Sequence, residues 1–294
     1  MKEVSRILIA YDGSACSDAA LEDLRRAGLP AAAEAVVISL AYVFLPPPAG
    51  EVPDSELVSP GVAVMVRPSQ AHAEAAVREA LAVAGRGAQK VKADFPGWAV
   101  RAEADGDSPA WAIVKLAGSF GADLVVVGSH GHSSAGGRLI LGSVSQRVLY
   151  EAPCSVRVAR CAGGRREGPA RIVVGYDGSA EAEAAVDAVA SRAWPEGSEA
   201  RVITALAAPR AAAGGPAASK LRAAGLSVSE GVRDGDPARA LVGEAEAWQA
   251  DAIFVGTRGL HGLRHLLRGS VSSAVAASAQ CSVEVVRPAR GGAA

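Results

Sequence analysis

The chain has 294 residues, of which half are hydrophobic and 4% aromatic, and its formal net charge is −1. This length exceeds the usual size of one hydrophobic core, so two domains are expected. A charge this close to zero gives no overall field that would attract nucleic acid or an anionic membrane. No apolar run approaches the roughly 20 residues of a membrane span, and no apolar signal segment precedes the first predicted strand. We therefore expect a cytoplasmic protein with no nucleic-acid partner and no membrane partner.

In the first half of the chain, short apolar runs bounded by Gly, Asp or Pro alternate with alanine-rich helical stretches. Runs that are apolar throughout suit strands buried on both faces of a parallel sheet. Their alternation with helices indicates βαβ units and hence a doubly wound α/β fold. The predicted strands are 6–11, 35–43, 98–104, 123–127 and 155–159, and the predicted helices are 15–27, 69–93, 108–120 and 142–151.

The second half follows the same order after a polar, glycine-rich linker at 161–170. The sequence therefore predicts one domain at 1–160 and a second at 171–294. In the second domain the predicted strands are 171–176, 200–206, 226–232, 251–255 and 282–286, and the predicted helices are 180–193, 217–224, 237–249 and 270–279.

Four matched landmarks indicate that the two halves are copies of one module, which we call repeat 1 and repeat 2. A period this long indicates a duplicated domain, because solenoid repeats span only about 20–50 residues. The landmark pairs, in the same order in each half, are 7–14 with 172–179, 123–131 with 251–259, 141–145 with 268–272, and 153–158 with 280–285.

Repeat 2 is the shorter copy between its second and third strands. Asp12 and Asp177 are 165 positions apart, whereas Gly128 and Gly256 are 128 apart, so repeat 2 lacks 37 residues in this region. Repeat 1 carries a proline-rich excursion at 46–60. A lid or interface loop and a disordered surface loop are both open interpretations of that excursion.

The cysteine and histidine patterns do not predict a metal site. No disulfide framework is expected among the four cysteines, and because the sequence has no C-x-x-C pair, structural zinc is not expected either. Cys16 lies in the first turn of a predicted helix, where the helix N-terminus lowers a thiol pKa, but simple packing is the preferred interpretation. His130 and His132 could form a metal-binding pair, but no carboxylate or thiol residue stands next to them. They are therefore interpreted as a loop feature near phosphate.

Chemistry-bearing residues stand at the ends of the first and fourth predicted strands. Asp12 and Asp177 follow the first strands, and Gly128 and Gly256 close the fourth. In an open parallel sheet, ligands bind beyond the carboxyl ends of strands where the winding direction reverses. Glycines there let the backbone approach a ligand closely. If the first and fourth strands are neighbours, the four residues face one crevice.

The next predicted helices begin with Gly-Ser-Val-Ser, so Ser143 and Ser270 lie in their first turns. Free N–H groups and the helix dipole favour an anion at such a position, which makes a phosphate cradle. An Asp across the crevice can accept hydrogen bonds from ribose hydroxyls or an adenine amine, so the set fits a nucleotide. Each part alone is also an ordinary turn or helix cap. Their joint occurrence in both repeats favours an anionic-ligand site.

This combination resembles the universal stress protein family in its tandem two-domain form, over nearly the whole chain. Nucleotide-binding members of that family show G-x-x-G, then nine residues, then G-S or G-T. Repeat 1 departs from the motif, with ten residues between Gly131 and Gly142. Repeat 2 matches it in full, at Gly256, Gly259, Gly269 and Ser270.

The resemblance implies roles for individual residues. Asp12 and Asp177 would contact ribose or adenine, and the backbone near Tyr42 and Leu206 would hold the adenine. The implied phosphate contacts are Gly128, Gly131, Gly142, Ser143 and Val144 in repeat 1, and Gly256, Thr257, Arg258, Gly259, Gly269, Ser270 and Val271 in repeat 2.

The resemblance also implies two Rossmann-like domains of the adenine nucleotide alpha hydrolase type, each with a five-stranded parallel sheet of order 3-2-1-4-5. The implied ligand is ATP or a related adenine nucleotide, with Mg²⁺ as a candidate companion ion. The last strands, 154–159 and 281–287, would pair to form an intrachain pseudo-dimer. A homodimer of two chains and the identity of any protein partner stay open.

The two predicted sites are unequal. Repeat 1 has the inserted loop residue, whereas repeat 2 has the intact loop but has lost much of the wall beside the adenine. Arg258, Arg264 and Arg268 make the loop of repeat 2 basic, which suits phosphate, although a solvated charged helix face gives the same pattern. We prefer repeat 2 for phosphate contacts and leave repeat 1 open as the better pocket.

Three functions compete. The first is a nucleotide-binding regulatory protein of the stress response. The second is a slow ATP hydrolase, although neither loop offers a carboxylate general base or a P-loop lysine, and no catalytic residue is assigned. The third is a nucleotide-free stress scaffold that acts through protein contacts.

Overall fold

The computed structural model describes residues 5–41, 60–130, 141–160, 168–206, 215–257 and 271–288, with only the backbone for 60–71 and 206. The elements of the first half are β1 (Arg6–Ala10), α1 (Ala15–Leu24), β2 (Glu34–Leu40), α2 (Pro60–Asp94), β3 (Ala99–Asp105), α3 (Pro109–Phe120), β4 (Leu124–Gly128), α4 (Ser143–Glu151) and β5 (Ser155–Ala159). Those of the second half are β6 (Arg171–Gly175), α5 (Ala180–Ala190), β7 (Glu199–Leu206), α6 (Gly215–Ala223), β8 (Ser227–Asp234), α7 (Pro237–Trp248), β9 (Ala252–Gly256), α8 (Val271–Ser278) and β10 (Ser282–Val286).

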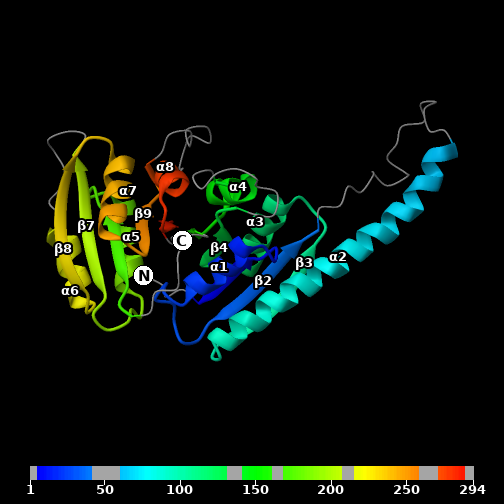
Figure 1. Ribbon diagram of the computed structural model, residues 1–294, viewed down its shortest axis with the longest axis horizontal. Helices are drawn as coiled ribbons and strands as arrows, with labels where there is room; N and C mark the ends of the chain where they lie inside the picture. The colour runs from blue at the N-terminus through cyan, green and yellow to red at the C-terminus, as the bar shows by residue number, and fades with distance from the viewer. Residues whose placement is uncertain are drawn as a thin grey trace, which may run out of the picture.

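The strands form one ten-stranded sheet in the order β3-β2-β1-β4-β5-β10-β9-β6-β7-β8. Each half is parallel and has the order 3-2-1-4-5, so the predicted doubly wound α/β fold is confirmed. The last strands of the two halves, β5 and β10, pair antiparallel at the centre, as predicted. Figure 1 shows the two halves side by side along this sheet.

The apolar strands supply both faces of the sheet to the core. On one face, residues of both halves, from Leu8 to Val285, form a single cluster under α3, α4, α7 and α8. On the opposite face the halves have separate clusters, one under α1 and α2 and the other under α5 and α6. One apolar core therefore runs across the junction between the halves on the first face of the sheet. On the opposite face, each half has its own core.

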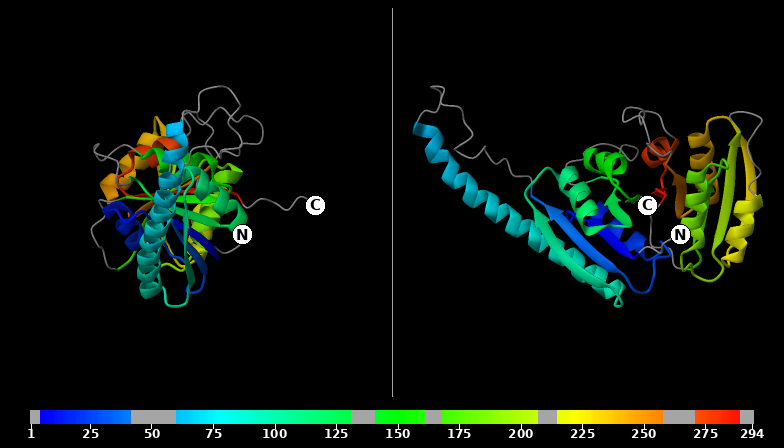
Figure 2. Two further views of the ribbon diagram at one scale, coloured as in Figure 1. Left: turned by 90° about the vertical axis from the view of Figure 1, so that its right-hand side faces the viewer. Right: turned by 180° about the vertical axis from the view of Figure 1, so that it is seen from behind.

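The second and third strands are joined very differently in the two halves. In the first half, the 35-residue α2 packs along β2 and β3, and its first turns extend away from the sheet (Figure 2). In the second half, α6 has nine residues. The difference in length between these helices, 35 against nine residues, accounts for most of the 37-residue shortening of repeat 2 inferred from the landmark spacing. The proline-rich excursion at 46–60 lies outside the described residues except for Pro60, the first residue of α2.

Most helix boundaries agree with the sequence to within a few residues, but α2 begins at Pro60 rather than at 69. Pro68 lies inside this helix, where proline normally ends or kinks a helix, and no described contact explains why the helix continues. None of the helices in the described ranges has the length and apolarity needed to cross a bilayer.

Candidate functional site

Matching Asp-Gly-Ser turns position the two predicted aspartates at the carboxyl ends of β1 and β6. In each turn the Asp Oδ1 accepts a hydrogen bond from the Ser backbone N–H two residues later, at 3.0 Å for both Asp12 and Asp177. Gly13 and Gly178 have φ of +78° and +77°, a conformation that glycine adopts without strain. The turns therefore hold both carboxylates at the strand ends, as the sequence predicts.

The serines of these turns cap the following helices. Ser14 Oγ accepts from the N–H of Ser17 at 3.2 Å, and Ser179 Oγ accepts from the N–H of Ala182 at 3.1 Å. The ordinary structural role of Asp-Gly-Ser is thus real in both repeats. The two aspartates of these turns are nevertheless exposed to solvent.

The ends of β4 and β9 come close to the first helix of their repeat. A Cβ built on Gly256 would lie 2.2 Å from the Glu181 carbonyl oxygen at the start of α5, so only glycine fits there. In repeat 1 the corresponding Cβ on Gly128 would lie 3.3 Å from the Cys16 carbonyl oxygen, which leaves more room. The first and fourth strands are neighbours in both repeats, so the aspartates and these glycines share one edge of the sheet.

In repeat 1, hydrogen bonds bring the predicted phosphate residues together. The Gly142 N–H donates to the Ser129 carbonyl at 2.8 Å, and Ser145 Oγ donates to the Gly128 carbonyl at 2.6 Å. Gly142 is the N-cap of α4, and the exposed Ser143 is its first residue. Val144 is half-buried in the first turn. The N-terminus of α4 therefore lies against the end of β4, where a helix favours an anion.

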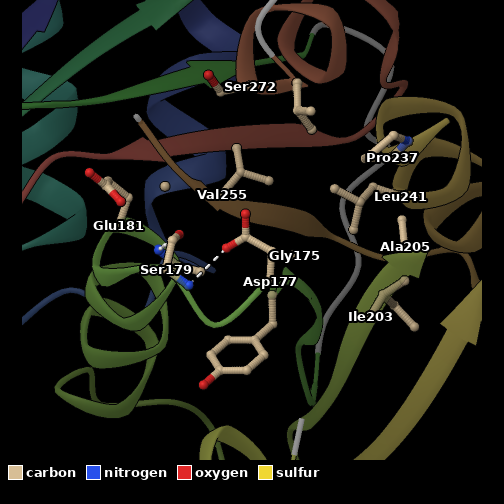
Figure 3. A pocket seen from close by; sticks show the side chains of 14 residues that line it. Gly175, Asp177, Ser179, Glu181, Ile203, Ala205, Pro237, Leu241, Val255 and Ser272 are labelled. Atoms are coloured by element: carbon tan, nitrogen blue, oxygen red, sulfur yellow. Dashed lines mark hydrogen bonds between the residues drawn. The ribbon is translucent and has the colours of Figure 1, made fainter. Parts of the chain in front are cut away.

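In repeat 2, a cavity of about 380 Å³ lies at the carboxyl ends of the strands. Three of the predicted site residues, Asp177, Gly256 and Val271, line it. Figure 3 shows the Asp177 carboxylate among the lining side chains, with its hydrogen bond to the Ser179 backbone. The remaining lining residues are Gly175, Tyr176, Ser179, Glu181, Ala182, Ile203, Ala205, Pro237, Leu241, Val255 and Ser272.

Thr257 does not line this cavity. Its backbone N–H donates to the Val286 carbonyl at 3.0 Å, and its buried hydroxyl donates to the same oxygen at 3.4 Å. Leu206 is the last residue of β7, as the predicted strand 200–206 has it, and its backbone alone is described. The predicted contacts that lie outside the described residues are Tyr42, Gly131, Arg258, Gly259, Gly269 and Ser270.

Sequence reasoning missed the apolar walls of the cavity. Ile203 and Ala205 project from the same face of β7, and Pro237 and Leu241 are four residues apart on one face of α7. Strand and helix periodicity contained this signal. Glu181 was also missed, and it places a carboxylate-bearing residue beside Gly256.

One cysteine prediction was wrong. Cys16 is disulfide-bonded rather than a simple packing residue. Its position in the chain gave no sign of this, because disulfide pairing depends on which sulfur atoms the fold brings together. Cys154 and Cys281 have free thiols, and burial raises the pKa of Cys281 to about 12. Within the described ranges, no group of three or more His, Cys, Asp or Glu side chains could hold a metal ion.

The fold and the strand-end site define a class: Rossmann-like α/β proteins built from a tandem module. The family model described as "Universal stress protein family" matches residues 3–160 and 207–287 of the chain. The chain belongs to the universal stress protein family. It is 31% identical over 310 residues to a universal stress protein of Mycolicibacterium smegmatis, covering 96% of this chain and 97% of that protein.

Solved structures agree on the fold. The chain is similar to a universal stress protein from Archaeoglobus fulgidus, with 20% identity, a TM-score of 0.63 and 98% of both chains covered. It is also similar to a putative universal stress protein from Pseudomonas aeruginosa, with 15% identity and a TM-score of 0.54 over 97% of this chain and 94% of the other.

Proposed function

We propose that this protein binds an adenine nucleotide, ATP or a close relative, in the cavity of repeat 2 and acts as a nucleotide-dependent regulatory protein of the stress response. The observation that carries the proposal is the cavity itself, which joins the Asp177 carboxylate, the Gly256 backbone and the first residue of α8. Its volume of about 380 Å³ falls within the range of small-molecule sites, roughly 300–1,000 Å³.

The lining suits the three parts of a nucleotide. Ile203, Leu241 and Val255 are at most 4% exposed and offer an apolar wall to a planar base. Asp177 can accept hydrogen bonds from ribose hydroxyls. The N-terminus of α8 at Val271 favours the negative charge of a phosphate. The predicted domain limits, 1–160 and 171–294, would put this site within the second domain.

A contact across the junction supports a regulatory role. α8 starts at the cavity, and its Ala276 carbonyl near the other end accepts a hydrogen bond from Arg160, which follows β5 of repeat 1. A ligand at the start of α8 therefore contacts a helix that the other repeat holds. Occupancy of the cavity would change how firmly the two repeats are joined.

Slow ATP hydrolysis is the second candidate function. Glu181 lines the cavity beside Gly256, so a carboxylate-bearing residue lies on the side where phosphate is expected. A carboxylate there could orient a water for attack, although phosphoryl transfer also needs charge neutralisation. Release of ADP from ATP by the parent, and its loss in Glu181→Gln, would support this activity. ADP release at the same rate in the variant would exclude a role for Glu181.

The binding proposal predicts nucleotide-dependent stabilisation of the full chain. ATP at 100 times its dissociation constant should stabilise the folded state by about 2.7 kcal/mol, seen as a rise in Tm that GTP matches less well. Asp177→Asn keeps the oxygen that the Ser179 N–H needs but removes the charge. Ala205→Leu installs the residue that repeat 1 has at Leu40 and fills the cavity. Both variants should reduce the ATP-dependent rise while their ligand-free Tm stays close to the parent.

The matched change Asp12→Asn tests repeat 1 in the same assay. The proposal expects a smaller loss from this variant than from Asp177→Asn. The reverse ranking would move the site to repeat 1. If no adenine nucleotide raises the Tm, and mass analysis of the denatured fresh protein finds none released, the scaffold function replaces the proposal.

A further inference from the structure

The junction between the two halves is built from two copies of the same strand. β5 and β10 are equivalent in the duplicated module, and they pair antiparallel with Arg157 directly opposite Glu284. These two residues occupy equivalent positions, three residues after Cys154 and Cys281. The junction therefore has an approximate two-fold axis that passes between Arg157 and Glu284.

One face of this junction is nearly symmetric. Val156 and Val158 of β5 and Val283 and Val285 of β10 are all at most 2% exposed and belong to the core cluster shared by both halves. This face would fit equally well if either strand paired with a second copy of itself. It cannot decide which strand pairs with which.

Two arginines beyond the strands follow the same symmetry. Arg160 donates to the Ala276 carbonyl of α8, and the equivalent Arg287 donates to the carbonyls of Leu149 and Tyr150 at 2.9 and 3.2 Å in α4. Each repeat thus binds carbonyls near the C-terminus of the other repeat's last helix, where a cation is favourable. Self-pairing of either repeat would preserve these contacts as well.

The opposite face of the junction carries a row of alternating charges, Asp23–Arg157–Glu284–Arg192. Arg157 Nε donates to Asp23 Oδ2 at 2.6 Å, and its Nη1 donates to Glu284 Oε2 at 3.3 Å. Arg192 Nη2 donates to Glu284 Oε1. The side chains of Arg157 and Glu284 are each 1% exposed, and that of Arg192 is 3% exposed.

This row breaks the symmetry of the duplicated module. Asp23 corresponds to Ala188 in repeat 2, and Arg192 corresponds to Ala27 in repeat 1. Arg192 also crosses the junction, because its Nη1 donates to the Ala27 carbonyl at 2.7 Å. Each repeat thus brings its own pair of charges, and they alternate in sign only when repeat 1 meets repeat 2.

We propose that this buried charge row makes the junction selective, so that β5 of repeat 1 accepts β10 of repeat 2 and neither strand accepts a second copy of itself. Self-pairing of repeat 1 would place Arg157 against Arg157, and self-pairing of repeat 2 would place Glu284 against Glu284. Buried like charges are strongly unfavourable, whereas a buried ion pair adds little over an apolar pair. The row therefore determines which strand each last strand pairs with. This inference does not depend on nucleotide binding.

The test uses four full-length chains in a D23A/R192A background, which gives positions 23 and 192 the alanine that the other repeat has. The background keeps Arg157 opposite Glu284. Adding R157E reproduces the Glu–Glu contact of a self-paired repeat 2, and adding E284R reproduces the Arg–Arg contact of a self-paired repeat 1. Adding both restores opposite charges in reverse order. A fifth chain, R157M/E284M in the same background, is the uncharged reference.

The Tm and the oligomeric state by native mass spectrometry are measured for each chain. The two opposite-charge chains should have the same Tm, and the Tm of the uncharged reference should be equal to theirs or higher. The two like-charge chains should melt lower by on the order of 10 °C or fail to fold as monomers. Like-charge chains that melt with the opposite-charge chains, or a double reversal that does not recover, would overturn the proposal. If the D23A/R192A chain does not fold, the same set of variants is made in a D23N/R192Q background, and the same results support or overturn the proposal.

Discussion

At the scale of single residues, two arginines allow the carboxylate of Glu244 to be buried. Glu244 of α7 is 7% exposed and accepts from Arg201 Nη1 at 2.6 Å and Arg233 Nε at 3.0 Å. Burial alone would raise the pKa of this carboxyl, but the two guanidinium groups outweigh burial and lower it. The ionised form of Glu244 therefore stabilises the folded second half.

The lowered pKa gives a pH-dependent prediction. Because the folded pKa lies below the unfolded value of about 4.3, this stabilisation is present above that value and is lost as pH falls through the folded pKa. Glu244→Gln should lower the free energy of unfolding by about 1–3 kcal/mol at pH 7, and the deficit should shrink below about pH 4. Urea unfolding of both chains at the two pH values measures this.

Glu230→Gln is the matched control, because Glu230 forms a more exposed pair with Arg222 at 3.3 Å. Its effect should stay within about 1 kcal/mol at either pH. A Glu244→Gln deficit that is equally large at low pH would show that packing, rather than charge, is what the substitution removes.

Residue-scale features of the site could be predicted to different degrees. The turns at Asp12 and Asp177 follow from local hydrogen bonding, which the sequence Asp-Gly-Ser specifies over three residues. Periodicity places Ala205 and Leu241 on one face of β7 and of α7, but that these two faces line a cavity depends on how the elements pack. The same holds for Arg157, whose partners Asp23 and Glu284 are more than 100 positions away.

At the scale of elements, the approach of a strand end to a helix start sets what the site tolerates. β9 ends at Gly256, where a Cβ would overlap the Glu181 carbonyl of α5 at 2.2 Å, whereas the Cβ at Gly128 would sit 3.3 Å from its nearest neighbour. Gly256→Ala must therefore push α5 away from β9, and Gly128→Ala needs a much smaller adjustment. Gly128 and Gly256 are equivalent in sequence, but they differ in how well they tolerate an added Cβ atom.

We expect Gly256→Ala to destabilise the chain by about 1–3 kcal/mol, the usual cost of overpacking, and Gly128→Ala to cost less. Urea denaturation of the two variants beside the parent measures the difference. Equal costs would mean that α5 moves without resistance. Gly256→Ala should also weaken any ATP-dependent rise in Tm, because the cavity borders the same contact.

Strand and helix placement was largely predictable because it follows from apolar periodicity and from the duplication itself, whereas the strand order was implied by the family resemblance. The start of α2 was not, because Pro68 normally ends a helix and the structure continues through it. Helix boundaries depend on such single residues, whereas the existence of an element depends on the pattern of all its residues.

At the scale of the whole molecule, the two halves share one sheet and one core face but keep separate cores on the other face. Leu21, 3% exposed, lies in the separate core of the first half, and Leu221, fully buried, lies in that of the second. A cavity made in either core can affect the other half through the β5–β10 junction, the shared face and the contacts that residues 26–28 make with the second half. The pair of leucines therefore measures how strongly the halves are coupled.

We expect Leu21→Ala to lower the stability of the first half by about 2–5 kcal/mol and to lower amide protection in β6 and β9 as well as in β1 and β4. Unfolding of the first half removes the partner of β10 and exposes the shared apolar face, so the second half should not stay folded alone. Hydrogen exchange read by mass spectrometry on peptides from each half measures this. Leu221→Ala should give the reciprocal result, with protection lost in β1 and β4. Protection lost only in the mutated half would show that the junction joins two independently stable units, and the continuous sheet would then be a contact between domains rather than one cooperative structure.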